Sequence, residues 1–240
     1  MSEIFKFKQF SVHQEKTAMK VGTDGVLLGA WCTIKDEYNS VLDIGSGTGL
    51  IALMMAQRSW AETIDAVELD FNAYEQTVDN FENSDWGDRL FCYNASFQEF
   101  ADEMSDEEEY YDLIISNPPF YNDSFQSKNT SRNMARFTDT LSFEDLFLGV
   151  AKLLSKKGKF AIIVPYKEEN KIQDIALQSG LYTKRICRVK GNVNTEIKRS
   201  LIEFSFDSSG VCYEDLVIEK SRHQYTEAYL NLTKAFYLKM

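Results

Sequence analysis

Long hydrophobic runs are missing from this sequence, in which no stretch approaches the roughly 18 consecutive apolar residues that a membrane-spanning helix needs. The first ten residues, MSEIFKFKQF, also lack the apolar core of a signal peptide, because Glu3, Lys6 and Lys8 interrupt their aromatic residues. These absences exclude a membrane partner and oppose export. We therefore expect a cytoplasmic protein.

Patterns of metal ligands and disulfides are absent as well. Four widely scattered cysteines are present: Cys32, Cys92, Cys187 and Cys212. They contain no CxxC pair, and the chain has only two histidines. Structural zinc sites use closely spaced ligand pairs, and disulfide frameworks belong to small, cysteine-dense domains. We expect free thiols in a reducing compartment and no metal.

Basic residues are outnumbered, with 26 Lys and Arg against 37 Asp and Glu, for a net charge of −11. Taken alone, this balance argues against a polyanionic partner. The charges are uneven, however. Residues 102–112 carry seven acids and no base, which predicts a solvated loop, whereas residues 156–199 carry eleven bases and four acids. Nucleic acid therefore stays possible as a partner on one face.

With 240 residues, of which 44% are hydrophobic, the chain predicts one folded domain. Short apolar runs predict strands at 41–44, 64–68, 90–94, 111–116, 160–164, 181–189 and 200–206. Helical spacing predicts helices at 50–58, 72–81, 143–154 and 168–178, and a docked helix in the tail 224–240. This alternation indicates an α/β fold with a mostly parallel, seven-stranded sheet, helices on both faces and a C-terminal antiparallel hairpin.

The first sheet strand runs into Asp43-Ile44-Gly45-Ser46-Gly47-Thr48-Gly49, where alternate glycines let the backbone turn sharply and approach a ligand. A dinucleotide fingerprint would need its third glycine one position later, so the pattern points away from NAD. Asp43 is placed to pair with an ammonium group. Glu68 ends the next strand, 19 residues beyond Gly49, where a carboxylate can accept both hydroxyls of a ribose.

The most specific motif is Asn117-Pro118-Pro119-Phe120, at the end of the apolar strand 111–116. Adjacent prolines fix the backbone, so the Asn117 side chain and the Pro118 carbonyl become two rigid acceptors. Two acceptors suit an NH2 group. If both of its hydrogens are held, the nitrogen lone pair is drawn out of conjugation and can attack an electrophilic methyl group. Phe120 then offers a flat face on which the planar group stacks.

With these three ordered motifs, residues 40–206 resemble the class I S-adenosylmethionine-dependent methyltransferases, in particular the branch with a [DNS]-PP-[YFW] motif that methylates amino groups. The resemblance implies a Rossmann-like methyltransferase sheet, S-adenosylmethionine as cofactor and Asn117, Pro118, Pro119 and Phe120 as catalytic residues. The implied cofactor contacts are Asp43, Gly45, Ser46, Gly47, Gly49, Glu68, Leu69, Ala95, Ser96 and Asn117. One departure is Ser96, which stands where such enzymes commonly have an Asp that contacts adenine.

The flanks extend the resemblance to nearly the whole chain. Residues 5–10, Met19-Lys20-Val21-Gly22-Thr23-Asp24-Gly25 and the segments 225–229 and 235–237 are similar to bacterial enzymes that methylate N6 of adenosine 37 in a valine tRNA. This similarity implies a tRNA partner and a single methyltransferase domain, 1–240. We divide it into an N-terminal cap (1–38), a catalytic core (39–206) and a C-terminal extension (207–240), and we expect a monomer.

Two basic loops are expected at the rim of the pocket, since ligand sites lie at the carboxyl ends of parallel strands. The predicted substrate contacts are Lys20, Thr23, Arg132, Arg136, Lys190, Lys198 and Arg199, and Lys20 and Asp24 are placed to close over the cofactor. Three alternatives stay open: a guanine N2 of ribosomal RNA, a glutamine side chain of a protein, or a non-catalytic binding module. The acidic net charge favours the glutamine substrate and the basic rim opposes it.

Overall fold

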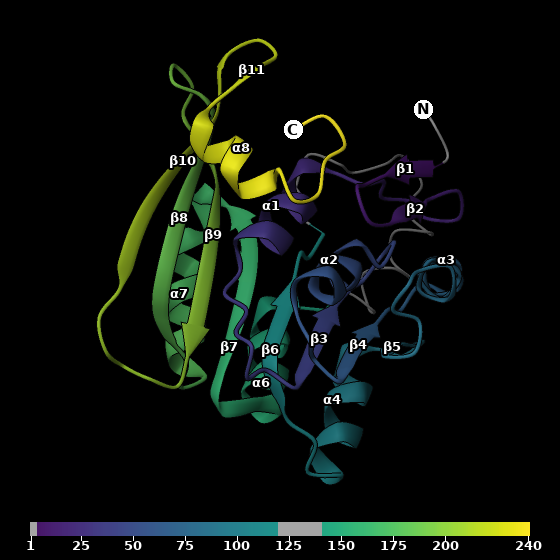
Figure 1. Ribbon diagram of the computed structural model, residues 1–240. Coiled ribbons are helices and arrows are strands. Elements are labelled where there is room, and N and C mark those ends of the chain that lie inside the picture. The colour runs from purple at the N-terminus through teal and green to yellow at the C-terminus, as the bar shows by residue number, and fades with distance from the viewer. Residues whose placement is uncertain (1–3, 120–140) are drawn as a thin grey trace, which may run out of the picture.

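A nine-stranded sheet crosses the molecule and carries helices on both faces (Figure 1). The computed structural model describes residues 4–119 and 141–240. The sheet order is β11-β10-β8-β9-β7-β6-β3-β4-β5. The strands are β3 (Ser40–Ile44), β4 (Thr63–Val67), β5 (Leu90–Tyr93), β6 (Tyr111–Ser116), β7 (Leu154–Pro165), β8 (Tyr182–Asn192), β9 (Ile197–Ser205), β10 (Cys212–Ser221) and β11 (Gln224–Tyr225).

Strands β3 to β7 run parallel, β9 is reversed between β7 and β8, and β10 lies parallel to β8. The predicted α/β class, parallel sheet and C-terminal hairpin are therefore confirmed. The structure adds β10 and β11, which lie in the tail segment 207–240, where only a docked helix was expected. That helix is present as α8 (Glu227–Thr233).

The parallel strands are buried on both faces because helices cover each one. Along β3, Val41 packs with α1 (Thr23–Trp31) and α2 (Leu50–Arg58) in one cluster. The next residue, Leu42, faces the opposite cluster with α4 (Phe97–Asp106), α6 (Phe143–Leu153) and α7 (Glu169–Gln178). The period of two along a strand thus divides the core into two layers. The short helix η1 (Tyr166–Glu168) precedes α7, and α3 (Phe71–Glu82) follows β4.

The two ends of the chain meet beside this sheet. A separate hairpin of β1 (Ile4–Lys6) and β2 (Ser11–His13) bridges the C-terminal segment through Phe7 and Tyr237. The Lys8 backbone N–H also donates to the Phe236 carbonyl at 2.8 Å. The N-terminal cap therefore reaches the site end of the molecule together with the C-terminal extension (Figure 1).

One local prediction is wrong. The acidic segment 102–112, expected as a loop, begins inside α4, which continues to Asp106. Ser96 and Glu99 form a capping box that starts this helix, and such a box stabilises a helix with a solvated acidic face. All four cysteines are free. In the two described ranges no group of His, Cys, Asp or Glu could hold a metal ion, and no helix is long and apolar enough to span a membrane.

Candidate active site

The loop between β3 and α2 lies at the carboxyl end of the sheet and exposes its backbone. Gly45, Gly47 and Gly49 all have positive φ angles, of 72°, 60° and 74°, which side chains disfavour. A Cβ atom added at Gly45 or Gly47 would meet nothing within 4 Å, so these two residues border open space. A Cβ atom at Gly49 would lie 2.6 Å from the Phe81 ring. Gly45 and Gly47 thus form an open cradle, and Gly49 is required for packing against α3.

Asp43 lies at the base of this cradle with one acceptor unused. It is 1% exposed, and its Oδ2 accepts a hydrogen bond from the Ala52 N–H at 3.1 Å. Its Oδ1 is buried without a partner among the described residues. Burial raises the pKa of Asp43 to about 7. A buried oxygen without a donor is costly, so this position is suited to a cationic ligand such as an ammonium group.

Glu68 follows β4 and reaches back to the glycine loop. Its Oε2 accepts a hydrogen bond from the Gly47 N–H at 2.8 Å, and its Oε1 accepts one from the Asp70 N–H at 2.9 Å. The structure therefore brings the predicted ribose ligand against the cradle. The side chain of the neighbouring predicted contact, Leu69, is 50% exposed.

Asn94 is a residue that the sequence prediction missed. Its Nδ2 donates to the carbonyl oxygens of Glu68, at 2.9 Å, and Leu69, at 3.2 Å. These bonds hold the backbone that directly follows the side chain of the predicted ribose ligand. The only available signal was its position directly after the third predicted strand, next to the predicted contacts Ala95 and Ser96.

Ser96 is occupied by its helix. Its hydroxyl accepts from the Glu99 N–H at 3.2 Å and donates to Glu99 Oε2 at 2.7 Å. The adenine contact at Ala95 and Ser96 stays a prediction. Because the Ser96 hydroxyl already bonds to Glu99, this geometry favours a contact through the backbone over one through the hydroxyl.

Asn117, Pro118 and Pro119 leave β6 beside the cradle. The Ser116 hydroxyl donates to the Ile44 carbonyl at 3.0 Å, which ties the end of β6 to the end of β3. On the other side, a Cβ atom at Gly25 would lie 3.8 Å from Asn117 Nδ2, so the first turn of α1 packs close to this amide. The motif is thus brought together with the glycine loop and the N-terminal cap. Phe120, Arg132 and Arg136 lie outside the described residues.

The other predicted rim residues come from two parts of the chain, the N-terminal cap and the hairpin of β8 and β9. Lys20 donates to the carbonyls of Gln14 and Thr17, so its ammonium holds the N-terminal loop rather than extending over the pocket. Thr23 is the first residue of α1. Arg199 forms an ion pair with Asp24 at 2.8 Å, which joins β9 to α1.

Lys198 and Arg199 line a cavity of about 370 Å³ together with residues 165–167, 196 and 197. Lys190 lies on β8, opposite Ile197 of β9. The predicted basic rim on this hairpin therefore stands next to a hollow at the carboxyl end of β7.

Known proteins resemble the chain over nearly its full length. Residues 26–175 match a family model described as methyltransferase small domain. The tRNA1(Val) (adenine(37)-N6)-methyltransferase of Christiangramia forsetii is 56% identical over 236 residues, 98% of each chain. A solved structure of a predicted O-methyltransferase, protein Atu636 from Agrobacterium tumefaciens, has a TM-score of 0.64 at 16% identity and covers 89% of this chain and 96% of its own. The SMU.776 protein, solved in complex with SAH, has a TM-score of 0.61 at 15% identity, over 85% of this chain and 56% of its own.

Proposed function

The chain belongs to the methyltransferase small domain family, alongside tRNA1(Val) (adenine(37)-N6)-methyltransferases, and from this membership we propose that it transfers a methyl group from S-adenosylmethionine to N6 of adenosine 37 in a valine tRNA. The observation that carries the proposal is the position of Asn117-Pro118-Pro119, which the Ser116 to Ile44 hydrogen bond holds beside the glycine cradle. An NH2 group and a methyl donor can therefore be held side by side.

The residues present fit S-adenosylmethionine. The unpartnered Oδ1 of Asp43 can accept from the ammonium group of its methionine part, and the open backbone of Gly45 and Gly47 leaves room for that part. We assign Glu68 to the ribose hydroxyls, and the position of its carboxylate against the Gly47 N–H, at the edge of the cradle, supports this role. Asn94 supports Glu68 by holding its carbonyl.

The reaction needs little covalent chemistry from the protein. The bound cofactor supplies an electrophilic methyl group on a sulfonium, which carries its own leaving group. Asn117 Oδ1 and the Pro118 carbonyl accept the two N6 hydrogens and direct the lone pair towards the methyl carbon. With the cofactor bound, the nitrogen would take the methyl group from the sulfonium, whose S–C bond would break, and would then release one proton to solvent. The protein therefore acts by placement and by polarising the amine.

The proposal also covers the substrate contacts. Lys190, Lys198 and Arg199 supply positive charge beside the pocket, and Arg132 and Arg136 belong to the segment that follows the motif. An anticodon-loop base is already largely unpaired, so turning it into the pocket costs a few kcal/mol at most. We further propose that the enzyme acts as a monomer in the cytoplasm.

The deciding experiment supplies labelled S-adenosylmethionine with unmodified tRNA, ribosomal RNA and protein release factors in parallel, followed by digestion and identification of the methylated product. We expect N6-methyladenosine from tRNA. Methylguanosine from ribosomal RNA or methylglutamine from protein would replace the proposed substrate, and no transfer despite tight cofactor binding would favour a non-catalytic module.

The role of the motif is tested by Asn117→Ala. We expect a loss of about 10²-fold or more in kcat, the scale of removing one preorganised polar group, with the affinity for the product SAH nearly unchanged. Asn231→Ala, on an exposed position of α8, is the matched control and should leave both quantities unchanged. An Asn117→Ala enzyme with normal kcat would remove this residue from the mechanism.

A further inference from the structure

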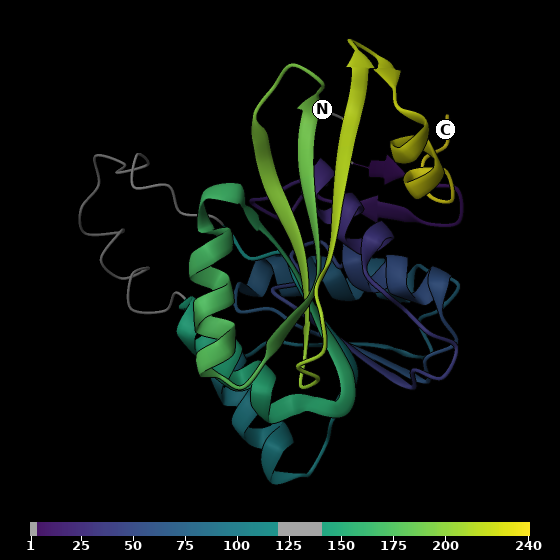
Figure 2. The same cartoon turned by 90° about the vertical axis from the view of Figure 1, so that its left-hand side faces the viewer.

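Two turns stand side by side at the carboxyl end of the sheet. One joins β8 to β9 and comprises residues 190–198, and the other joins β10 to β11 and comprises residues 219–225. Glu219 pairs with Asn192, so the two turns are neighbours along the sheet. Figure 2 shows both hairpins extending beyond the helices at this end. We call residues 190–198 and 219–225 the paired turns.

The turn between β10 and β11 is held in shape by its own contacts. At its base, Thr226 donates its N–H to the Ile218 carbonyl at 2.9 Å and its hydroxyl to the Val217 carbonyl. At its tip, the Ser221 hydroxyl donates to Gln224 Oε1 at 2.9 Å. Thr226 also caps α8, which packs on β10. These contacts therefore fix the turn relative to β10 and α8.

The paired turns carry positive charge in an acidic chain. They contain four cations, Lys190, Lys198, Lys220 and Arg222, against two carboxylates, Glu196 and Glu219. None of the four cations forms an ion pair with a residue of the ranges 4–119 and 141–240. Lys198, Lys220 and Arg222 are exposed. Such groups are available to a polyanion.

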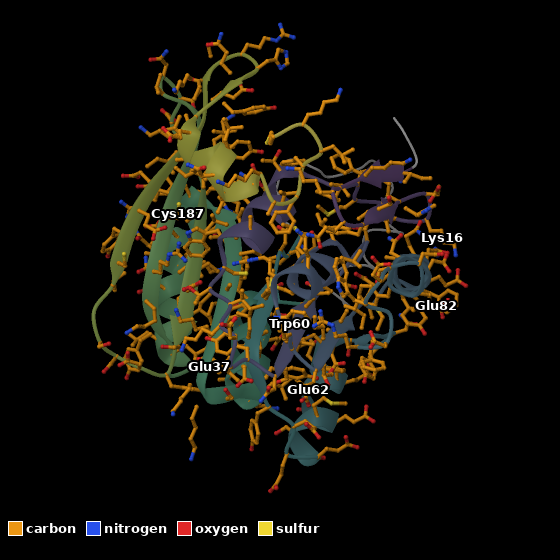
Figure 3. The ribbon with its side chains drawn as sticks, viewed as in Figure 1. Lys16, Glu37, Trp60, Glu62, Glu82 and Cys187 are labelled. Carbon is orange, nitrogen blue, oxygen red and sulfur yellow. The ribbon has the colours of Figure 1, made fainter. Side chains whose placement is uncertain are left out.

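Several carboxylates lie at the opposite end of the sheet. Glu37 precedes β3 and Glu62 precedes β4, and Figure 3 shows both far from the paired turns. The acidic residues 107–109 likewise precede β6. These carboxylates lie away from the paired turns, so they do not oppose the approach of a polyanion to the end that carries the site.

The paired turns extend past the level of the reacting amine. Arg199 pairs with Pro165, three residues beyond Ile162, the partner of Ser116 in β6. From Arg199 the chain continues outward for four residues to Thr195, which at about 3.3 Å a residue is on the order of 13 Å. An RNA whose loop base enters the pocket keeps its adjoining helix outside the pocket, on the side towards which these turns extend.

We propose that the paired turns bind the phosphate backbone of the RNA stem that adjoins the target loop. This inference rests on the proposed function and adds to it the surface that grips the substrate outside the pocket. Each phosphate neutralised by a Lys or Arg steepens the salt dependence of binding by about 0.7 to 0.9 in the slope of log K against log salt concentration. The contacts read the stem by its charge and not by its sequence.

The test compares the double variant Lys220→Ala/Arg222→Ala with the control Lys156→Ala/Lys157→Ala, which removes two exposed lysines at the amino end of β7. Binding of labelled full-length tRNA and of a loop oligonucleotide without a stem is measured over a salt series, together with kcat and KM. We expect the Lys220/Arg222 variant to raise the Kd and KM for tRNA about tenfold and to reduce the salt slope by between one and two, from two lost phosphate contacts.

In the same variant, kcat and the affinity for the loop oligonucleotide should stay at wild-type values, and the control should match the wild type throughout. An unchanged Kd and salt slope with tRNA, or an equal loss with tRNA and with the loop oligonucleotide, would overturn the proposal for the paired turns. Absence of transfer from the wild-type enzyme to any RNA would instead overturn the proposed function. In that case, the binding measurement still tests whether the paired turns contact the RNA stem.

Discussion

Asp43 has opposite effects on the free protein and on its complex. Its buried carboxyl group receives one hydrogen bond, from Ala52, and leaves Oδ1 without a donor among the described residues. Burial raises its pKa from 3.8 to about 7. In the free protein this ionised group therefore destabilises the fold. In the complex, a cationic ligand can bind to the same unused acceptor, Oδ1.

The substitution Asp43→Asn should stabilise the free protein and weaken cofactor binding. Between pH 4 and pH 7 the folded state holds a proton that the unfolded state has lost, so the free energy of unfolding contributed by Asp43 falls as pH rises through this window. At pH 8 we expect the variant to be more stable by about 2 to 4 kcal/mol, the scale of a shift of roughly three pKa units. Urea unfolding at pH 5 and pH 8 measures this difference.

Calorimetric titration with SAH provides the second readout for Asp43. In the wild type, affinity should fall as pH is lowered from 8 to 6, because protonation removes the charge that faces the ammonium group. The variant should bind at least tenfold more weakly at pH 8 and show a flatter pH profile. Equal affinities of wild type and variant at pH 8 would show that Asp43 does not contact the ammonium group.

The element between β3 and α2 contains glycines with two separate functions. Gly45 and Gly49 have nearly the same φ, of 72° and 74°, so a side chain strains the backbone to a similar degree at both. They differ in what a Cβ atom meets, which is open space at Gly45 and the Phe81 ring at Gly49. The repeated glycines in the sequence indicated a ligand loop but could not separate these functions, because Phe81 is 32 residues away.

We expect Gly45→Ala to weaken SAH binding tenfold or more while lowering the free energy of unfolding by only about 1 kcal/mol, the cost of a side chain at positive φ. Gly49→Ala should lower it by roughly 2 to 4 kcal/mol, because overpacking against Phe81 adds to the same strain. Urea unfolding and SAH titration of both variants measure the contrast. Equal stability losses in the two variants would show that the Phe81 ring on α3 moves aside for the new Cβ atom without strain.

Sequence patterns identified the elements that are buried and missed those that lie at edges. The central strands were predictable because parallel strands covered on both faces read as continuous apolar runs. Strand β10 was not, since Leu216 is its only buried residue and the remaining residues, which are half-buried or exposed, show no strong alternation. Helix α4 carried a readable signal, the capping box of Ser96 and Glu99, but its acidic surface suggested a loop.

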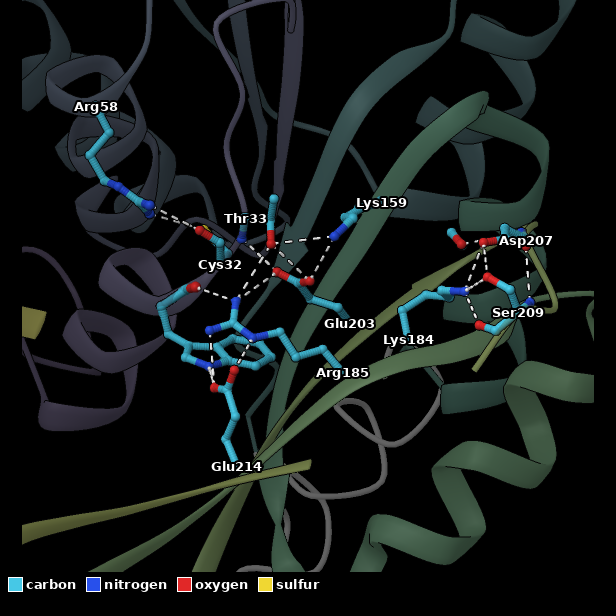
Figure 4. A network of polar contacts seen from close by, with 12 residues as sticks. Cys32, Thr33, Arg58, Lys159, Lys184, Arg185, Glu203, Asp207, Ser209 and Glu214 are labelled. Atoms are coloured by element: carbon cyan, nitrogen blue, oxygen red, sulfur yellow. Dashed lines mark hydrogen bonds and ion pairs between the residues drawn. The ribbon is translucent and has the colours of Figure 1, made fainter. Parts of the chain in front are cut away.

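At the scale of the molecule, long-range polar contacts were the least predictable part of the fold. Figure 4 shows the clearest case, in which Glu203 of β9 accepts from the Thr33 N–H at 2.5 Å and from Lys159 Nζ at 3.1 Å. Arg185 of β8 lies 3.7 Å from the same carboxylate and stacks over the Trp31 ring at 4.2 Å. Glu203 and its partners come from four separate segments of the chain, so no local spacing reveals the network.

The substitution Glu203→Gln should therefore destabilise the whole molecule without touching the site. Glu203 is fully buried, and its loss leaves Lys159 and Arg185 without their shared carboxylate. Breaking a buried pair costs about 3 to 5 kcal/mol, and because these two cations are 24% and 26% exposed we expect a smaller loss, about 2 to 3 kcal/mol. The control Asp102→Asn breaks the exposed pair with Lys152 and should cost less than about 1 kcal/mol.

Urea unfolding measures both values, and SAH affinity should be unchanged in each variant because Glu203 lies away from the glycine cradle. A Glu203→Gln protein as stable as the control would mean that Thr33, water and, for Arg185, its ion pair with Glu214 hold the two cations equally well. Glu203 would then add no stability to the contact between α1 and the antiparallel strands.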